Sequence, residues 1–240
     1  MDFLSKMKYS ISIVLPVYNE ESGLKSTLKG LVPILEKTFS NYEIIIVESG
    51  STDRSGEIAD EAAKKNKKVK VIHQGERKGY SNGIREGLRN CKNDISMYID
   101  CDNPYDFKYL KEAAKYIGKY DAVIGYKIGK RESFGRLVLS KGAYIINKML
   151  FGLDAKDINY PFKMIKTEFV KKMNLFSDAY LIPVELLVGL KKQKAKIKEI
   201  EVPHKNRREG ESKMGISNMI IGHSTEIIQY LLKRKKLYSR

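Results

Sequence analysis

The stretch Ile95 to Asp106, ISMYIDCDNPYD, decides the fold class and indicates where the site lies. A run of strand-forming residues ends there in two carboxylates, Asp100 and Asp102, separated by one residue. Side chains two residues apart in an extended strand point the same way, so both acids reach one spot. Open α/β sheets bind ligands at the carboxyl ends of their strands, and paired carboxylates there suit a divalent cation that holds phosphates. The competing interpretation is a polar strand end leading into the Asn103-Pro104 turn.

The composition is that of a folded and strongly basic protein. The chain has 240 residues, of which 42% are hydrophobic and 31% charged, which argues against global disorder. Its formal net charge of +16 attracts nucleic acid, anionic lipid surfaces or phosphorylated substrates. Cys91 and Cys101 have neither metal-ligand nor disulfide spacing, so we expect a reducing, cytoplasmic setting. No signal peptide is visible, and no apolar window reaches the roughly 20 residues that span a bilayer.

Strand and helix patterns alternate through the first half of the chain. Strands are expected at 11–17, 42–47, 69–73, 95–99 and 121–125, with helices at about 23–38, 55–65, 79–90 and 107–118. This repetition predicts an α/β fold, with a mostly parallel sheet flanked by helices, in a single domain. Beyond Lys127 we expect helices at 131–153 and 184–192, short strands at 162–165 and 197–202, and a basic amphipathic helix at 219–236.

Three loops carry further candidate site residues. PVYNEES (16–22) and VESGSTDRSGE (47–57) follow buried strands and lead into helices, which is where nucleotides are contacted and where helix amides face anions. The alternative for both loops is an ordinary capped helix start, with Asn19 or Ser22 capping the first helix. RKGYSNGIREG (77–87) places glycines four residues apart on one helix face, which favours close packing against the sheet. Lys78 and Gly79 are candidates for approaching the ligand.

In this order, the segments resemble the family 2 glycosyltransferases, whose fold is the Rossmann-like GT-A fold. Within that family the chain is most similar to the dolichyl-phosphate mannose synthase group, which glycosylates polyprenyl phosphates. IVLPVYNEESGL, IIIVESGSTDRSGEIAD and MYIDCDNPYD match its first three motifs. The later signatures are more specific: DINYPFKMI at 157–165, the Glu-Leu-Leu helix, the Glu-Val-Pro strand, and the Arg-x-x-Gly-x-Ser-Lys ending at 207–213. The resemblance covers roughly residues 9–213.

The resemblance implies an inverting glycosyltransferase that moves a sugar from GDP-mannose or a UDP-sugar to a polyprenyl or dolichyl phosphate. It implies Mg²⁺ or Mn²⁺ on Asp100 and Asp102. The expected nucleotide-binding residues are Pro16, Tyr18, Glu20, Glu48, Ser49, Lys78, Gly79, Asp100, Cys101 and Asp102. The expected catalytic residues are Asp100, Asp102, Arg136, Arg207 and Lys213. The expected acceptor-side residues are Lys127, Asp157, Phe162, Lys163, Glu185 and Ser212.

The chain departs from the family pattern at several of these positions. Glu48 and Ser49 replace two aspartates, which leaves the choice of base open. Lys127 stands where an arginine is usual, and Tyr160-Pro161 stands where the group prefers Ser-Gly. We expect residues 1–126 to form a nucleotide-binding half, 127–215 an acceptor-side half, and 216–240 a basic amphipathic C-terminal helix.

The expected acceptor sets the expected mechanism and location. A phosphate acceptor is already ionised at neutral pH, so the chemistry needs cationic groups that hold two polyanions together rather than a strong base. The expected location is peripheral, on the anionic cytoplasmic face of a membrane, with segments 143–153 and 219–232 lying in the interface. Core packing is the alternative for both segments, and an equal one for the first. The sequence does not indicate the oligomeric state.

Three other functions compete with this interpretation. A family 2 transferase acting on a saccharide hydroxyl needs a carboxylate base, for which Asp157 or Glu185 is available. A non-catalytic nucleic-acid-binding protein is the distant alternative; it is disfavoured because aromatic residues are not interleaved with the basic runs, so we expect no nucleic acid partner. A nucleotidyltransferase on a similar sheet would leave the Arg-x-x-Gly-x-Ser-Lys ending without a role.

Overall fold

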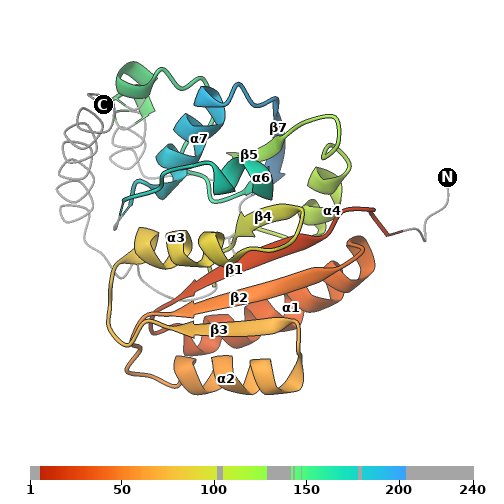
Figure 1. Ribbon diagram of the computed structural model, residues 1–240, viewed down its shortest axis with the longest axis vertical. Coiled ribbons are helices and arrows are strands. Elements are labelled where there is room, and N and C mark those ends of the chain that lie inside the picture. The colour runs from red at the N-terminus through yellow and green to blue at the C-terminus, as the bar shows by residue number, and fades with distance from the viewer. Residues whose placement is uncertain are drawn as a thin grey trace.

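The apolar run ISIVLPV forms β1 (Ile11–Val17), the strand around which the sheet is built (Figure 1). The computed structural model describes residues 6–101, 105–128, 142, 144–146, 148–177 and 180–203. The other strands are β2 (Tyr42–Glu48), β3 (Val69–His73), β4 (Ile95–Tyr98), β5 (Ala122–Ile128), β6 (Lys163–Lys166) and β7 (Ile197–Pro203). The helices are α1 (Glu21–Thr38), α2 (Ser55–Lys65), α3 (Tyr80–Asn90), α4 (Lys108–Ala114), α6 (Thr167–Lys171) and α7 (Ile182–Lys192).

The seven strands form one mostly parallel sheet in the order β3-β2-β1-β4-β6-β5-β7. The strands β1 to β4 pair in parallel, β5 and β7 pair in parallel, and β6 runs antiparallel between β4 and β5. The chain moves outward from β1 through β2 to β3 and then returns to place β4 on the other side of β1. This reversal creates a topological switch point between β1 and β4, the position at which open α/β sheets bind ligands.

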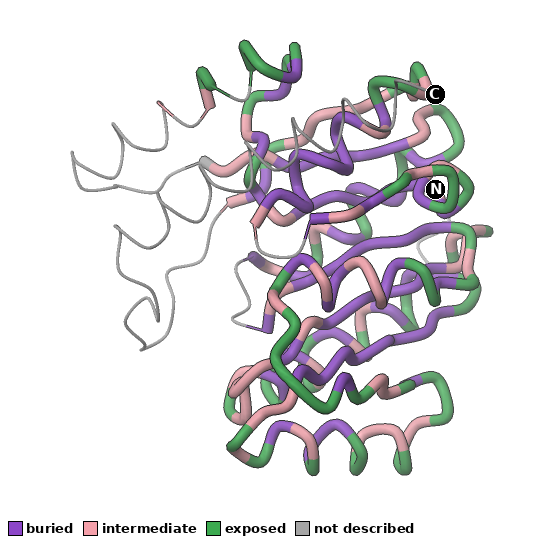
Figure 2. The backbone as a smooth tube through the Cα atoms, turned by 60° about the vertical axis from the view of Figure 1, so that its left-hand side comes forward, coloured by how far each residue is buried: buried purple, intermediate pink, exposed green. Residues whose placement is uncertain are grey.

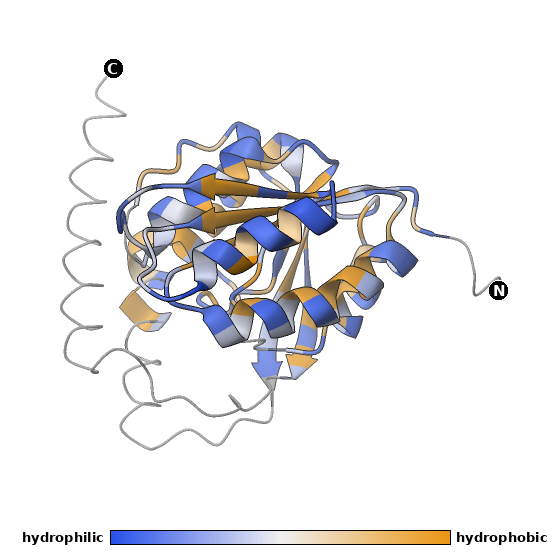
Figure 3. Ribbon diagram, turned by 90° about the horizontal axis from the view of Figure 1, so that it is seen from below, coloured by the Kyte–Doolittle hydropathy of each residue, from blue (hydrophilic) through white to orange (hydrophobic). Residues whose placement is uncertain are grey.

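Two apolar layers hold the helices against the sheet. The helices α1, α2 and α4 pack on one face, and α3, α6 and α7 pack on the other. The strands are largely apolar, whereas the helices carry hydrophilic residues on their outer sides (Figure 3). Burial of each large aliphatic side chain contributes about 1.5–3 kcal/mol, which explains why near-continuous apolar runs form the central strands.

The glycine-rich face of α3 packs closely on the sheet, as its spacing predicts. A Cβ atom on Gly87 would lie 2.2 Å from Cγ1 of Val14 in β1, so no side chain fits between helix and strand there. A Cβ on Gly83 would meet Pro16 and Ser49 at ordinary contact distances of 3.8 and 3.7 Å. The small face therefore brings the N-terminal end of α3 close to the loops that follow β1 and β2.

The predicted fold class is confirmed, and the main departures lie in the second half. β1 and β3 have the predicted bounds, whereas α6 was not expected from the sequence. Residues 144–146 and 148–151 are helical, as expected for part of 131–153. The remainder of that helix and the whole C-terminal segment lie outside the described residues. Within the described part of the chain, no helix is both long and apolar enough to cross a bilayer.

Figure 2 shows that the strands of the sheet are mostly buried, whereas turns and outer helix faces are more exposed. One short helical stretch carries a group of exposed, large apolar side chains, which we call the apolar patch. It consists of Ile145 (54% exposed), Ile146 (48%), Met149 (80%) and Leu150 (39%). Tyr144 and Phe151 lie one heptad apart on the opposite side of this stretch and pack against the core beside α3 and α7. The outer face of this stretch is exposed, which agrees with the expectation that it lies in a membrane interface. Its inner face packs in the core, which agrees with the alternative.

Candidate functional site

The acidic motif lies at the switch point of the sheet. The amide of Ile99 donates to the carbonyl of Val14 at 2.9 Å, so β4 remains alongside β1 to within one residue of Asp100. The half-buried residues Pro16 and Tyr18 follow on the neighbouring strand. Asp100 and the β1 loop are therefore brought to the same edge of the sheet, as their positions after parallel strands predict.

The carboxylate of Asp100 is oriented by a tyrosine from α3. The hydroxyl of Tyr80 donates to Oδ1 of Asp100 at 2.6 Å, a short charge-assisted hydrogen bond. Tyr80 is the first residue of α3, which the small face of that helix holds close to the strands. Sequence reasoning missed Tyr80, because a surface tyrosine in a glycine-rich segment carries no pattern that links it to a carboxylate twenty residues later.

The loops after β1 and β2 are joined to each other by side-chain hydrogen bonds. The amide of Asn19 donates to Oγ of Ser51 at 3.1 Å, and the amide of Thr52 donates to Oδ1 of Asn19 at 2.8 Å. The amide of Glu20 donates to Oγ of Ser55 at 2.8 Å. The expectation that Asn19 or Ser22 caps α1 was wrong: the cap residue is Glu20, and it makes no side-chain capping bond. Polar groups from the second loop take over that role.

Glu48 and Ser49 lie beneath this loop pair rather than on its surface. Glu48 is 6% exposed; its Oε1 accepts from the amide of Ser51 at 2.5 Å, and its Oε2 lies 3.1 Å from Nδ1 of His73. Burial alone would raise the pKa of Glu48, but the hydrogen bonds from Ser51 and His73 lower it. Ser49 is 7% exposed and donates to Oε1 of Gln74 at 2.7 Å. Both residues are buried under the predicted nucleotide-binding loops and stabilise them through these hydrogen bonds.

An arginine completes the exposed surface of this loop group. The guanidinium carbon of Arg77 lies 4.5 Å from the ring centroid of Tyr18, which is cation–π geometry. The next residues, the exposed Lys78 and the half-buried Gly79, lead into α3. The sequence singled out the segment that contains Arg77 but not Arg77 itself, since nothing local indicates that its guanidinium meets the β1 loop.

The middle residue of the acidic motif faces inward. Cys101 is 3% exposed, and its carbonyl accepts from Oγ1 of Thr27 at 3.1 Å. A Cβ on Gly23 would lie 2.6 Å from the same carbonyl oxygen. The first turn of α1 thus approaches the backbone of the motif so closely that position 23 requires glycine. The predicted contact of Cys101 with the nucleotide is limited to its backbone while the side chain stays buried.

On the acceptor side, the predicted residues from the 157–165 motif form a buried turn. Lys163 is 1% exposed, and its Nζ donates to the carbonyls of Ile158 at 2.9 Å and Tyr160 at 2.5 Å. Burial lowers the pKa of Lys163 to about 7, against an upward effect of Asp157. Phe162 is fully buried, with its ring centroid 5.0 Å from that of Tyr105. Lys163 and Phe162 in this geometry shape the turn and do not present themselves to an acceptor.

Asp157 begins the same turn, and Glu185, in α7, bonds to the segment that precedes that helix. The half-buried Asp157 accepts from the amide of Tyr160 at 3.1 Å. Glu185 is 4% exposed, and its carboxylate accepts from Oγ of Ser177 at 2.9 Å and from the amides of Phe176 and Ser177. Burial raises the pKa of Glu185, and these hydrogen bonds oppose that rise. Glu185 therefore holds the segment that precedes α7.

The remaining predictions divide between β5 and the undescribed segments. Lys127 is half-buried in β5, in register with Val202 of β7. The residues Asp102, Arg136, Arg207, Ser212 and Lys213 lie outside the described residues, so their predicted roles stay predictions.

The described residues are compatible with a metal ion whose coordination shell is completed by substrate. Among them, no group of three or more His, Cys, Asp or Glu side chains is arranged to hold a metal ion. Mg²⁺ in phosphate-handling sites binds through one or two carboxylates, with phosphate oxygens and water completing its shell. Asp100, held by Tyr80 at the switch point, fits that pattern as the described half of the predicted pair.

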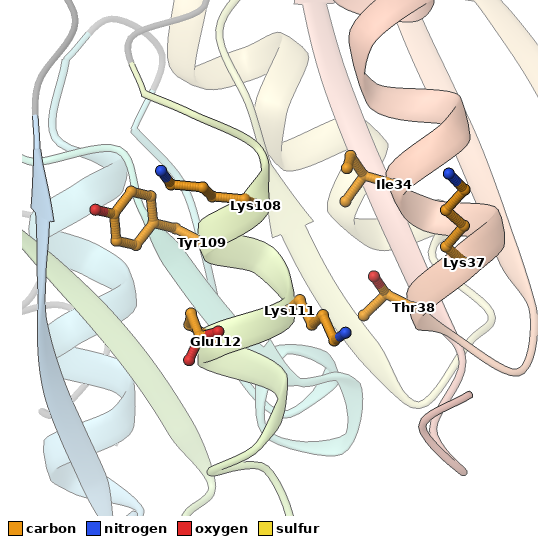
Figure 4. A pocket seen from close by; sticks show the side chains of 7 residues that line it. All are labelled: Ile34, Lys37, Thr38, Lys108, Tyr109, Lys111 and Glu112. Atoms are coloured by element: carbon orange, nitrogen blue, oxygen red, sulfur yellow. The ribbon is translucent and has the colours of Figure 1, made fainter. Parts of the chain in front are cut away.

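A cavity of about 430 Å³ lies elsewhere, between the C-terminal end of α1 and α4 (Figure 4). Its lining consists of Ile34, Lys37, Thr38, Lys108, Tyr109, Lys111 and Glu112. Because α1 rises 1.5 Å per residue, this cavity is about 20 Å along the helix from Gly23 and the acidic motif. It is separate from the loops described above.

Comparisons with known proteins agree with this geometry. The family model described as "Glycosyl transferase family 2" matches residues 12–173. A dolichol-phosphate mannosyltransferase of Pyrococcus furiosus is 31% identical over 214 residues, covering 85% of this chain and 59% of the relative. An undecaprenyl-phosphate 4-deoxy-4-formamido-L-arabinose transferase of Edwardsiella ictaluri is 29% identical over 215 residues, covering 88% and 64%. The chain thus spans less than two thirds of the length of these relatives.

Solved structures establish the fold independently. Glucosyl-3-phosphoglycerate synthase of Mycobacterium tuberculosis, in complex with Mn²⁺, UDP and glucosyl-3-phosphoglycerate, superposes with a TM-score of 0.71 at 19% identity. The superposition covers 94% of this chain and 80% of that protein. A second structure of that synthase, with Mg²⁺ and UDP, gives a TM-score of 0.64 over 85% of this chain and 73% of the synthase, also at 19% identity.

Proposed function

The chain belongs to glycosyl transferase family 2, and from that premise we propose that it transfers a sugar from a nucleoside-diphosphate sugar to a polyprenyl phosphate, with inversion at the anomeric carbon. The observation that carries the proposal is the meeting of Asp100, Tyr80 and the linked β1 and β2 loops at the switch point between β1 and β4. The names of the relatives, a polyprenyl-phosphate and a dolichol-phosphate sugar transferase, support the acceptor class.

In the proposed site, the donor nucleotide lies across the loops after β1 and β2. Tyr18, stacked on Arg77, forms an aromatic and cationic wall that suits a nucleobase and a negatively charged diphosphate. Asp100 and Asp102 would hold the ribose and a Mg²⁺ or Mn²⁺ ion, which supplies charge stabilisation for the leaving diphosphate. The structures of the mycobacterial synthase, crystallised with either metal, support this choice without deciding between the two ions.

The acceptor phosphate enters from the side of the second half. Its oxygen is ionised at neutral pH, so attack on the sugar requires no proton transfer to the protein. The task of the chain is to hold two polyanions in line, which suits guanidinium and ammonium groups. We propose Arg136, Arg207 and Lys213 for that role, with Ser212 and Lys127 beside them. Residues 1–126 then serve the nucleotide and 127–215 the acceptor.

If the acceptor were a saccharide hydroxyl, the burial of Glu185 would reduce the number of carboxylates that can act as the general base. A general base must come within about 3 Å of the proton that it removes. The carboxylate of Glu185 is buried and engaged by Phe176 and Ser177, so of the two carboxylates named for this reaction only Asp157 remains suitable. Asp157 itself already accepts a hydrogen bond from the amide of Tyr160.

Transfer of labelled sugar tests the proposed reaction. The purified chain is incubated with radiolabelled GDP-mannose or UDP-sugars, a polyprenyl phosphate and either Mn²⁺ or Mg²⁺, and label is counted in the organic phase. We expect lipid-extractable label with one donor, and its loss when EDTA is added. Label that appears only on a saccharide acceptor, and falls when Asp157 is changed to Asn, would contradict the lipid-phosphate proposal.

We also propose that the apolar patch rests on an anionic membrane surface. The exposed faces of Ile145, Ile146 and Met149 supply apolar area, and the net charge of +16 supplies attraction to anionic headgroups. A lipid acceptor requires such proximity to a bilayer, and we propose that the face is the cytoplasmic one.

Sedimentation with vesicles tests this placement. We expect binding to phosphatidylglycerol-containing vesicles and little binding to pure phosphatidylcholine vesicles. Met149→Glu should bind roughly tenfold more weakly, since a charge replaces an apolar side chain that would be buried in the bilayer. Tyr116→Glu, at a tyrosine that is 37% exposed beyond α4, is the matched control and should bind normally. Equal weakening by both substitutions would overturn the proposed orientation.

A further inference from the structure

His73, the last residue of β3, lies between two carboxylates from two other elements. Its Nδ1 is 3.1 Å from Oε2 of Glu48 in β2, and its Nε2 is 3.0 Å from Oδ1 of Asp60 in α2. Ionised carboxylates only accept hydrogen bonds, so both contacts are satisfied only if both ring nitrogens carry a hydrogen. The geometry therefore requires the doubly protonated, positively charged imidazolium.

The two carboxylates differ in how much they depend on that charge. The side chain of Asp60 is 50% exposed, so water can solvate it in the absence of the ring. The side chain of Glu48 is 7% exposed, so water cannot replace the ring and its charge depends on hydrogen-bond and cationic partners within the protein. The charged groups that face the ring are these two acids, since the exposed Glu57 and Glu61 of α2 pair with Arg54 and Lys65. Loss of the proton from His73 removes this cationic partner and leaves the amide of Ser51 to carry more of the stabilisation of Glu48.

Glu48 transmits this state to the donor loops through a chain of hydrogen bonds. Its Oε1 accepts from the amide of Ser51, whose Oγ in turn accepts from the amide of Asn19. Asn19 has a positive φ of 53°, a left-handed conformation that asparagine tolerates better than most non-glycine residues, and its bonds with Ser51 and Thr52 hold it there. Asn19 is flanked by Tyr18 and Glu20, the residues predicted to contact the nucleotide.

We propose that the imidazolium of His73 positions the donor-binding loops, so that nucleotide binding weakens as this residue loses its proton. The inference rests on the proposed donor site, and it adds a positioning residue that has no counterpart among the motif residues of the chain. His73 does not touch the nucleotide in this account; it acts through Glu48, Ser51 and Asn19.

The pKa directions agree with this arrangement. The hydrogen bonds to Asp60 and Glu48 raise the pKa of His73 above its ordinary value of 6.5, against the opposing effect of burial. A raised folded-state pKa means that the stabilisation is complete below the unfolded pKa and is lost as the pH rises through the folded one. The carboxyl of Glu48, with its lowered pKa, stays ionised throughout that interval. Positioning should therefore decline as the pH rises from neutral to alkaline.

The first experiment measures the protonation of His73 directly. The chain has 3 histidines, so their ring protons are assigned by His→Gln variants and titrated by NMR. We expect His73 to titrate above its ordinary value, and Asp60→Asn to lower that value by about half a unit or more. Glu61→Gln, at the neighbouring exposed residue of α2, is the control and should leave it unchanged. Titration of His73 at or below its ordinary value would overturn the proposal.

The second experiment measures the affinity for Mn²⁺–UDP and Mn²⁺–GDP between about pH 6 and 9. The ratio of the dissociation constants of His73→Gln and the unaltered chain removes the titration of the nucleotide itself. We expect a ratio of about three to ten at the acidic end, which corresponds to roughly 1 kcal/mol, and a ratio near one at the alkaline end. A ratio independent of pH would reduce His73 to a structural residue and contradict the coupling.

The outcome also separates this inference from the proposed function. If neither nucleotide binds at any pH, the proposed function fails. The coupling is then read from amide hydrogen exchange at Ser51 and Asn19, which should accelerate more steeply with pH in the unaltered chain than in His73→Gln. Identical pH slopes in the two proteins would overturn the coupling on its own.

Discussion

Polar residues do different work in the two halves of the molecule. In the donor half, side chains from one loop bond to the backbone of another, as when Ser51 and Ser55 accept from the amides of Asn19 and Glu20. In the acceptor half, the amine of Lys163 is buried and bonds to the backbone of its own turn. The comparison teaches that these polar side chains link two loops at the sheet edge in one half and support their own turn in the other.

The difference follows from the topology. The loops after β1, β2, β3 and β4 leave the same edge of a parallel sheet, so their polar groups meet one another. β6 enters antiparallel between β4 and β5, so the turn that precedes it is enclosed by core residues such as Tyr105 and Phe162. A charged side chain buried there hydrogen-bonds to the surrounding backbone and stabilises the turn, because buried polar groups must be satisfied internally.

Asp100→Asn should produce the largest effect and should act on function alone. We expect transfer to fall by at least about 100-fold, because the carboxylate proposed to hold the metal ion, whose charge would stabilise the leaving diphosphate, is lost. The melting temperature should change little, since the residue is half-buried and keeps its bond from Tyr80. Asp106→Asn is the control, since the side chain of Asp106 bonds to Lys108, two residues along the chain. An enzyme that keeps a third of its activity after Asp100→Asn would remove the distinction between the halves.

Lys163→Met should have the opposite profile and act mainly on stability. The loss of two buried hydrogen bonds is expected to cost about 2–3 kcal/mol in urea unfolding. Burial lowers the pKa of Lys163 to about 7 in the folded protein from its ordinary 10.5, so between these values the unfolded chain binds more protons. Stability of the unaltered protein therefore gains up to about 1.4 kcal/mol per pH unit from this residue.

The cost of Lys163→Met should accordingly grow between pH 7 and about 9. The matched control is Lys166→Met in the same strand, where a partly exposed amine pairs with Asp121 at 2.7 Å. Its cost should stay flat over that interval. If the cost of Lys163→Met falls with rising pH instead, Lys163 is not buried as described.

Gly87→Ala tests whether close packing of α3 brings Tyr80 to Asp100. The added methyl group meets Val14, and the overpacking should lower the free energy of unfolding by about 1–3 kcal/mol. In the helical stretch before the apolar patch, Gly142→Ala meets nothing within 4 Å and should be neutral or stabilising by up to about 1 kcal/mol. Equal effects at the two glycines would show that α3 is free to shift away from the sheet.

Arg77→Ala should have the smallest effect. Removal of the guanidinium over Tyr18 is expected to weaken Mn²⁺–nucleotide binding about two- to fivefold, since an exposed cation–π contact contributes about 0.5–1 kcal/mol. Arg54→Ala, which breaks an exposed pair with Glu57 on α2, is the control and should not change affinity. Loss of affinity beyond that range would mean that Arg77 contacts the diphosphate itself.

The sequence predicted the framework of the donor half and only the position of the acceptor half. Apolar runs such as 11–17 and 69–73 are long enough to mark buried strands, and the order of motifs marks the sheet edge. Strand direction is not encoded in an alternating pattern, so the antiparallel entry of β6 was not predictable. Helix α6, with only five residues, is too short to show a helical period.

Contacts across long sequence separations account for what was missed at the site. The bond between Asn19 and Ser51, and the position of His73 between Glu48 and Asp60, depend on how strands are ordered in space. The motif placed Lys163 on the acceptor side, but lysine is usually exposed, so its burial was not predictable from the residue type.

Calorimetric titration of UDP and GDP, with and without Mn²⁺, tests the central claim most directly. The account predicts that one nucleotide binds at least about tenfold more tightly with the metal than without it, because phosphate oxygens complete a shell begun by the acidic pair at the β1–β4 edge. Binding of equal strength in EDTA, or no binding of either nucleotide with the metal present, would contradict it.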